Sequence, residues 1–139
     1  MTSIIHYVIS HIETKQFAMF PDLYVNGKET MVNTAVQFRV VSDYSRIRNI
    51  TKFSYYQDNN LLLVLELICD FEINPEATED IKKDGKIDMN FLRYIASISV
   101  GTARGVIHSE TKGSVLNPVI LPPIDLTKLI TGDMILKQA

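Results

Sequence analysis

The three histidines come first, because imidazole supplies most general bases and many metal ligands. His6 and His11 lie five positions apart in a segment with strand-like alternation. We therefore expect them to face opposite sides of a strand and to share no ligand or proton. His108 lies beside Glu110 near the expected end of a helix, where the helix dipole favours a cation, so a capping role is the simplest interpretation. None of the three is predicted to be catalytic.

The other chemistry-bearing residues also lack a catalytic pattern. The sequence has no serine-nucleophile motif, no glycine-rich phosphate loop and no closely spaced metal ligands. Asp80, Asp84 and Asp88 are spaced by four, which does not match the alternating ligands of an EF-hand, and we expect them in a solvated loop. Cys69 alternates with leucines and is predicted to be a buried small hydrophobe. We expect a protein that is not an enzyme and needs no cofactor or metal.

One pattern could bind single-stranded nucleic acid. Basic residues that could share a strand face lie close to tyrosines: Arg46, Arg48 and Lys52 with Tyr44, Tyr55 and Tyr56. The chain has 14 basic and 16 acidic residues, however, and a formal net charge of -2, which cancels the field that such binding needs. We therefore expect neither nucleic acid nor an anionic membrane as a partner.

Length and composition predict one soluble domain over residues 1–139, and a chain of this size can bury roughly two thirds of its unfolded surface. A single cysteine permits no internal disulfide, which favours a reducing cytoplasm. Residues 1–6 have no basic region, so a signal peptide is not expected. The longest nearly apolar run, Leu61 to Cys69, contains Glu66 and is far shorter than the ~20 residues of a membrane helix.

Residues 4–73 are predicted to form four strands, because apolar residues recur at every second position. The segments end near positions 20, 40, 56 and 73. In the first, Ile5, Tyr7 and Ile9 are expected on one face, with Ile4, Val8 and Ile12 on the other. Residues 58–60 predict a tight turn, and therefore a hairpin of the third and fourth strands.

The helical part is predicted over residues 87–131. Residues 75–86 form a polar stretch, and Asp88 can then cap a long amphipathic helix that ends before Lys112. Residues 116–123 contain three prolines and are expected to be extended. Asp125 can cap a short helix that Gly132 ends. The predicted fold class is α+β: a four-stranded antiparallel sheet with one long and one short C-terminal helix packed on one face.

The expected sheet has more apolar surface than two helices can cover, because the first and fourth strands are apolar on much of both faces. Buried central strands would also have this pattern. Otherwise a second subunit or a bound polypeptide must cover the remainder. The long helix has a middle of small residues, in which Gly101 and Gly105 each cost about 1 kcal/mol relative to alanine. A closely packed neighbour would explain them.

Several local motifs, in this order, resemble the SecB protein-export chaperone family. Residues 9–17 resemble its opening strand, and residues 63–67, with Glu66 among apolar residues, resemble its fourth strand. Phe91-Leu92 followed by Ala103-Arg104-Gly105 is similar to its long helix. Leu116, Leu121-Pro122-Pro123 and Asp125-Leu126 resemble its crossing into the last helix. The resemblance covers roughly residues 4–131.

The resemblance implies a homotetramer, with long helices packed between subunits, that holds unfolded precursor polypeptides in the cytoplasm for export without ATP. We expect client or interface contacts at apolar residues: Phe17, Phe20, Leu61, Leu63, Leu65, Leu116, Val119 and Leu121. The subunit interface on the helix is expected at Ser99, Gly101, Thr102 and Gly105. The family's motor partner, SecA, would meet Glu66.

Two departures weigh against SecA. Acidic positions of the family's first strand are matched here by about Gln16 and Phe20. The sequence ends at residues 135–139 without the cysteine and histidine tail by which some members bind zinc and SecA. Two alternatives stay open: a specialised chaperone of a toxin-antitoxin system, with an antitoxin as partner, and a small-ligand-binding domain with a pocket that holds His6 or His11.

Overall fold

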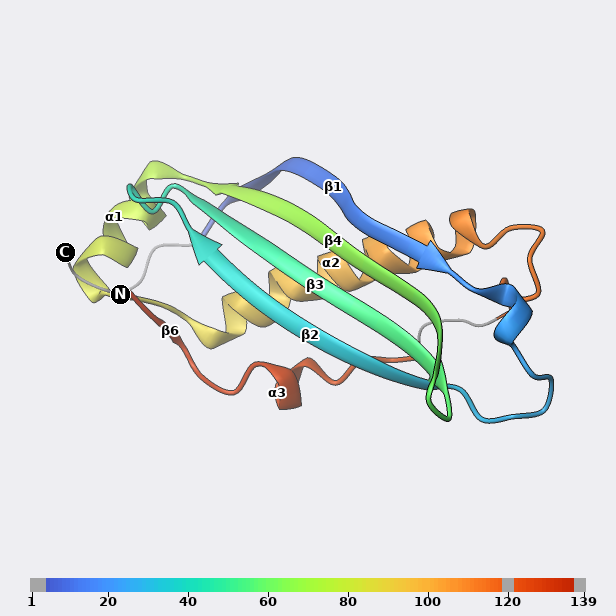
Figure 1. The fold of residues 1–139 in the computed structure, drawn as a ribbon. Helices are drawn as coiled ribbons and strands as arrows, with labels where there is room; N and C mark the ends of the chain where they lie inside the picture. Colours follow the sequence, from blue (N-terminus) through green and yellow to red (C-terminus); the bar gives the residue numbers. More distant parts are fainter. Residues whose placement is uncertain (1–4, 119–121, 137–139) are drawn as a thin grey trace.

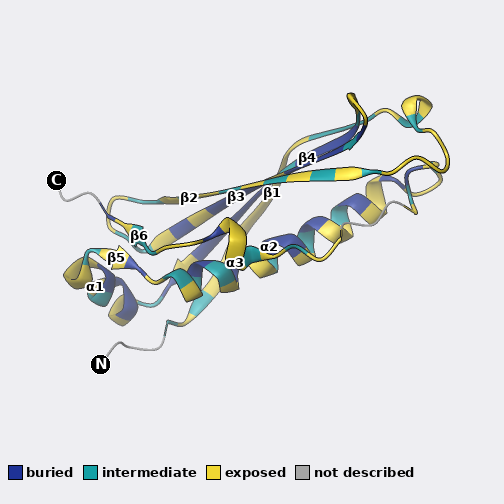
Figure 2. Cartoon of the chain, turned by 90° about the horizontal axis from the view of Figure 1, so that it is seen from below, coloured by how far each residue is buried: buried dark blue, intermediate teal, exposed yellow. Residues whose placement is uncertain are grey.

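A computed structural model describes residues 5–118 and 122–136, so the predicted contacts at Val119 and Leu121 lie outside the described residues. The chain forms two layers, a twisted sheet and a long helix that crosses beneath it (Figures 1 and 2). The sheet has four antiparallel strands, and the predicted α+β fold class is confirmed.

The strands are β1 (Tyr7–Met19), β2 (Met31–Val40), β3 (Arg46–Gln57) and β4 (Asn60–Ile73), in the order β1-β4-β3-β2. The predicted hairpin of β3 and β4 is confirmed. Its two-residue turn places Asp58 at a φ of 52°, a left-handed conformation that aspartate tolerates better than most residues. The edges of the sheet are therefore β1 and β2.

The inner face of the sheet carries the core. Phe53 and Tyr55 of β3 pair with Leu65 and Leu63 of β4, and all four side chains are buried. Cys69 belongs to the same layer, as predicted, and burial raises the pKa of its thiol. Strict alternation along β3 and β4 therefore places one large apolar layer against the helix.

The long helix α2 (Met89–Glu110) begins where predicted, because the Asp88 side chain accepts a hydrogen bond of 2.9 Å from the Asn90 backbone N–H. Its buried stripe faces the sheet: Leu92, Ile95, Ala96, Ser99, Val100, Ala103 and Ile107. The helix packs against β3 and β4, the two central strands. The edge strand β1 lies outside this main contact.

Residues 75–84 are helical, and the expected polar loop is wrong at this point. Helix α1 (Pro75–Asp84) has proline in its first turn, and Gly85 ends it with a φ of 68°. Ala77 and Ile81, four residues apart, bury one face of an otherwise polar helix. Asp80 and Asp84 are thus helical residues. Among the residues described, no group of three acidic, histidine or cysteine side chains could hold a metal ion.

The C-terminal part returns beneath the sheet. The short helix α3 (Leu126–Leu129) is capped by Asp125 as predicted, but it ends at Leu129, with Ile130 as its C-cap, rather than at Gly132. A small unpredicted sheet pairs β5 (Lys86–Ile87) with β6 (Met134–Ile135) beside α1 (Figure 1). The 3₁₀ turn η1 (Pro21–Leu23) follows β1. No helix in the described part of the chain is long and apolar enough to span a membrane.

Strand β1 contains two bulges, and they change which residues share a face. Its register with β4 shifts between Ile9 and His11 and again between Thr14 and Gln16. Ile12 therefore lies on the inner face with Tyr7 and Ile9, and the expected placement of Ile12 beside Val8 is wrong. The first bulge also interrupts the alternation between Ile9 and His11. The expectation that His6 and His11 face opposite sides of the strand depended on that alternation, so it no longer follows.

Candidate functional site

The inner face of β1 is partly exposed, although the same face of the neighbouring strand β4 is buried. Ile9 pairs with Phe71 and Ile12 with Cys69, whose side chains are buried, yet Ile9 is 40% and Ile12 51% exposed. The reason is that α2 covers β3 and β4 and leaves β1 beside it. Tyr94 on the flank of α2 is also exposed. We call these three residues, Ile9, Ile12 and Tyr94, the uncovered strip.

Aromatic contacts close one end of the uncovered strip. The Tyr7 ring on β1 lies edge-to-face with Phe71, Phe91 and Tyr94, at centroid distances of 5.8, 6.3 and 5.8 Å. The hydroxyls of Tyr7 and Tyr94 are 3.2 Å apart, and this hydrogen bond raises the pKa of Tyr7. The strand and the helix are therefore joined at the Tyr7 end of the strip.

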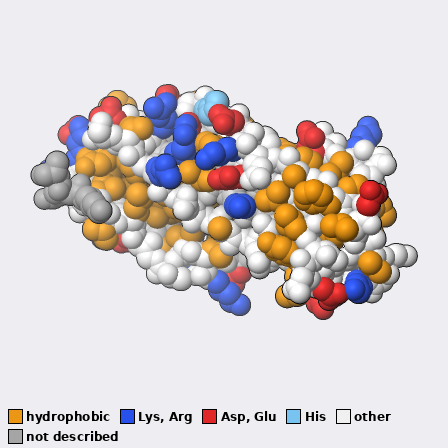
Figure 3. Space-filling model, in the orientation of Figure 1, with side chains coloured by type: hydrophobic (Ala, Val, Ile, Leu, Met, Phe, Trp, Pro, Cys, Tyr) orange, Lys and Arg blue, Asp and Glu red, His pale blue; other side chains and the backbone are white. Residues whose placement is uncertain are grey.

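A second apolar surface lies where β1 ends and β2 begins. Its four large side chains are each more than 40% exposed: Phe20, Leu23, Val25 and Met31. We call this set the apolar end surface. Hydrophobic side chains gather over this end of the sheet in Figure 3.

The loop that carries the apolar end surface is held in place by a buried amide. Gln57 accepts a hydrogen bond of 2.8 Å from the Val25 N–H and donates bonds of 2.9 and 3.3 Å to the Val25 and Lys28 carbonyls. The Phe20 N–H donates to the Leu62 carbonyl at 2.8 Å. The exposed side chains are thus presented on a fixed backbone, which lowers the entropy lost when a partner binds.

The structure separates the predicted client residues into two groups. Phe17 and Leu61 are half-buried and Phe20 is exposed, so these three contribute to the surface. Leu63, Leu65 and Leu116 are buried in the core of the single chain, where they have no surface to offer another polypeptide. Alternating leucines on a central strand were therefore a sign of the core.

The residues predicted at a subunit interface also divide. Ser99 faces the sheet, is buried and donates a bond of 3.4 Å to the Ile95 carbonyl. Gly101 and Gly105 lie on the outer side of α2, and a Cβ at either position would have no atom within 4 Å. Thr102 is half-buried beside them and donates to the Ile98 carbonyl. Within the single chain, nothing requires glycine at positions 101 and 105.

Glu66 lies on the outer face of the sheet, opposite Gln16 on β1 and Lys52 on β3. Its carboxylate is 4.0 Å from the Lys15 ammonium. Lys15 and Lys52 therefore offset the negative charge of Glu66, the one acidic position of the resembled family that this sequence keeps.

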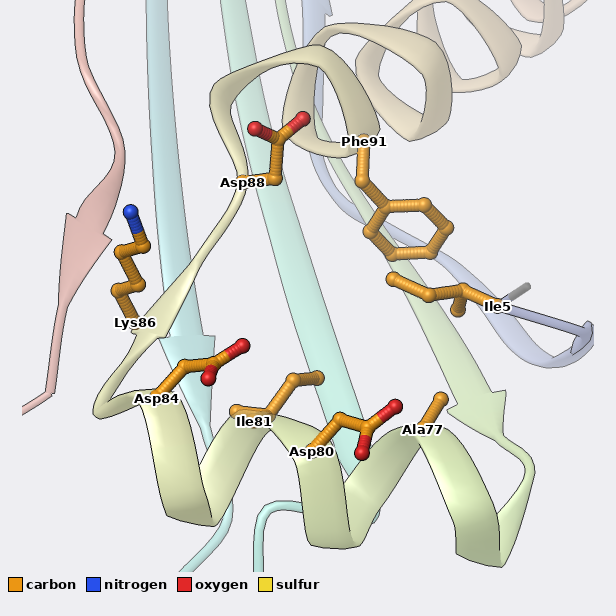
Figure 4. Close-up of a pocket in the computed structure, with 8 residues that line it drawn as sticks. All are labelled: Ile5, Ala77, Asp80, Ile81, Asp84, Lys86, Asp88 and Phe91. Atoms are coloured by element: carbon orange, nitrogen blue, oxygen red, sulfur yellow. The ribbon is translucent and has the colours of Figure 1, made fainter. Parts of the chain in front are cut away.

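The histidines do not gather into a pocket. His11 is exposed and lies 3.0 Å from the Glu13 carboxylate. A hollow of about 290 Å³ lies between α1 and the start of α2, but its lining includes neither His6 nor His11. Figure 4 shows Phe91 and Ile5 together on one side of this hollow, with Asp80 and Asp84 extending from α1. Its Lys86 pairs with Asp133 at 3.4 Å.

The basic and aromatic pattern considered for nucleic acid is also dispersed. Arg46, Arg48 and Lys52 lie on the outer face of β3, whereas Tyr55 is buried on the inner face. A base therefore could not stack on Tyr55 from the face that carries the basic side chains.

No protein-family model matches the chain, and no curated protein matches it. Among solved structures the chain is similar to a SecB-like chaperone of Mycobacterium tuberculosis, Rv1957, in complex with a ChAD peptide from the Rv1956 HigA1 antitoxin. That match has 13% sequence identity and a TM-score of 0.47, and it covers 86% of this chain and 91% of the other.

Proposed function

We propose that this chain is a molecular chaperone that holds unfolded polypeptides without ATP and is not an enzyme. The observation that supports the proposal best is the uncovered strip together with the apolar end surface: seven exposed large hydrophobic residues, most of them on or next to the edge strand β1. Surfaces of this kind mark sites where another chain binds.

The proposed contact combines two kinds of interaction. An extended client segment would place apolar side chains against Ile9, Ile12 and Tyr94. The free edge of β1 would offer backbone N–H and C=O groups for pairing, since β1 is paired on one side only, with β4. Backbone pairing adds affinity without sequence preference, which a chaperone of many clients requires.

The first test uses a reduced or acid-unfolded substrate whose aggregation is followed by light scattering. The pure protein is expected to slow aggregation at stoichiometric concentration without nucleotide. The double variant Ile9→Ser, Ile12→Ser is expected to lose most of this effect, because it removes apolar contacts worth about 1–3 kcal/mol.

The matched control is the double variant Val115→Ser, Leu129→Ser, which removes two exposed hydrophobic residues outside β1, in the turn after α2 and in α3. It is expected to keep the holding activity. A wild-type protein that leaves aggregation unchanged would refute the chaperone proposal, and equal losses in both double variants would refute the assignment to β1.

We further propose that the outer side of α2 is a subunit interface of a homotetramer. Ser97, Gly101 and Gly105 recur at intervals of four on this side, so a helix from another subunit could approach the backbone closely. The proposal gives the two glycines the reason that the single chain does not.

One double variant distinguishes a subunit interface on α2 from a solvent-exposed helix. Gly101→Ala with Gly105→Ala adds two methyl groups where the subunits would meet, and the mass measured by light scattering is expected to fall below that of a tetramer. If α2 faced solvent instead, the mass would stay unchanged and the helix would gain about 1 kcal/mol per substitution. Thermal unfolding of the same samples distinguishes these cases.

We propose that clients bind through apolar segments, because the proposed surface is apolar. Both an export precursor and an antitoxin could provide such a segment. We do not propose SecA as the partner, because Glu66 lies between lysines. We propose a cytoplasmic location, since the holding of unsecreted precursors takes place there.

A further inference from the structure

The outer face of the sheet holds an arginine cluster that the chaperone proposal does not use. A hollow of about 270 Å³ lies at the end of this face and is lined by Arg39, Val40, Val41, Arg46, Arg48 and Asp70. Basic side chains gather over this part of the sheet in Figure 3. Three arginines and one aspartate therefore share a small site.

Strand register brings these charges together. One row across the sheet runs from Arg39 on β2 to Arg48 on β3, Asp70 on β4 and His11 on β1. Arg46 is two residues before Arg48 and therefore lies on the same face. Like charges directly opposite each other destabilise a sheet, and Arg39 faces Arg48 in this way.

Both carboxylate oxygens of the single aspartate accept hydrogen bonds from one arginine. Arg48 donates from Nε and Nη2 to the two Asp70 carboxylate oxygens at 2.8 and 2.9 Å. Within the described part of the chain, no carboxylate lies within ion-pair distance of Arg39 or Arg46. Glu72 is opposite Arg46 in register but forms no ion pair with it. Two exposed guanidinium groups are therefore left to face a partner.

We propose that Arg39 and Arg46 bind the carboxylates of an acidic polypeptide segment on the outer face of the sheet. A guanidinium group binds a carboxylate through two parallel N–H···O bonds, and Arg39 and Arg46 flank a hollow in which such a group fits. Val40 and Val41 add apolar contact for the rest of the bound side chain. This surface is distinct from the uncovered strip, and the proposal does not depend on the chaperone function.

The surrounding acids favour a polypeptide over a nucleic acid. Asp70 lies inside the site, Glu72 is opposite Arg46, and Glu13 is close enough to affect the pKa of Arg48. A phosphate backbone, with one charge per about 3.4 Å of strand, would meet these carboxylates. Isolated carboxylates on a flexible chain can contact the arginines and avoid the acids.

The test measures fluorescence anisotropy of a labelled twelve-residue peptide of glutamate, serine and glycine with four glutamates. The wild-type protein is expected to bind it, with an affinity that falls as salt is added. The same peptide with glutamine in place of glutamate should not bind. The double variant Arg39→Gln, Arg46→Gln is expected to weaken binding about tenfold or more, since it removes two charge-assisted contacts.

A matched variant, Lys83→Gln with Lys112→Gln, removes the same charge from exposed positions outside the four-stranded sheet and is expected to bind like the wild type. Thermal unfolding should show that Arg39→Gln, Arg46→Gln is folded and at least as stable as the wild type. The reason is that it removes the repulsion between Arg39 and Arg48, which face each other across β2 and β3. Absence of binding by the wild type, or equal losses in the two double variants, would overturn the proposal. So would a single-stranded DNA oligonucleotide that binds more tightly than the peptide and through the same arginines.

Discussion

Replacing Phe71 with alanine is expected to lower the free energy of unfolding by about 3–5 kcal/mol. The Phe71 side chain is fully buried on β4 and lies between Ile47 on β3 and Ile9 on β1. The Tyr7 ring packs edge-to-face against it at 5.8 Å. The substitution removes a large apolar group from a layer that cannot collapse, because three strands and a helix hold its walls apart. Urea unfolding followed by circular dichroism measures the loss.

The matched control is Ile9→Ala, at the position paired with Phe71 on the edge strand. Ile9 is partly exposed in the uncovered strip, so its truncation is expected to cost about 1 kcal/mol or less. Comparable losses at Phe71 and Ile9 would contradict the described packing, since they would mean that β1 is covered as fully as β4.

The fold was predictable from the sequence wherever one local pattern determines one local structure. The alternation along β3 and β4, the Asp58 turn and the Asp88 cap each depend on neighbours in the chain, and the structure confirms them. Helix α1 has similar signals in Pro75 and Gly85. It was missed because only Ala77 and Ile81 form its apolar stripe, which is too short to give a visible period.

The bulges of β1 could not be predicted from the sequence. Ser10 and Lys15 are ordinary strand residues, and the extra residue at each bulge is recognised only from the register with β4. Each bulge changes the face of every later residue, and so Ile12 was placed on the wrong side.

The sequence predicted that β1 would carry excess apolar surface, but it identified only some of the exposed residues. Excess apolar surface on β1 was visible in the alternation of Ile5, Tyr7 and Ile9 with Val8. Which apolar residues remain exposed depends on the path of α2 over β3 and β4, and this is a tertiary feature. Leu63 and Leu65 lie under the helix, whereas Ile9 and Ile12 lie beside it. Leu23, Val25 and Met31 gave no periodic signal, because they lie in or next to a connection.

The second large effect is expected at Asp70, whose replacement by asparagine should lower the free energy of unfolding by about 2 kcal/mol at pH 7. Asp70 is only 2% exposed, and its carboxylate accepts two hydrogen bonds from Arg48. The amide of asparagine keeps the shape but loses the charge, which leaves Arg48 without its counterion. The value lies below that of a fully buried pair because the Arg48 side chain is partly exposed.

The same pair predicts how this loss depends on pH. Hydrogen bonding from Arg48 lowers the pKa of Asp70 below that of an unfolded aspartate, which is near 3.9. A group with a lowered pKa in the folded state stabilises the protein above its unfolded pKa, and this stabilisation is lost as the pH falls through the folded value. Wild type and Asp70→Asn should therefore differ most between pH 5 and 7, and their unfolding curves should converge below about pH 4.

Asp43 provides the matched control, because hydrogen bonds from Ser45 also lower its pKa but it is exposed. Asp43→Asn is expected to change stability much less than Asp70→Asn between pH 5 and 7, since solvent screens an exposed carboxylate. If Asp70→Asn cost the same free energy at pH 3 as at pH 7, the loss would come from packing and the charge pair would have no role. If instead the stabilities of wild type and Asp70→Asn converge at low pH, while Asp43→Asn changes stability little, the stabilising charge is that of Asp70. Asp70 then belongs to the row of charges across the sheet in which Arg39 has no carboxylate partner.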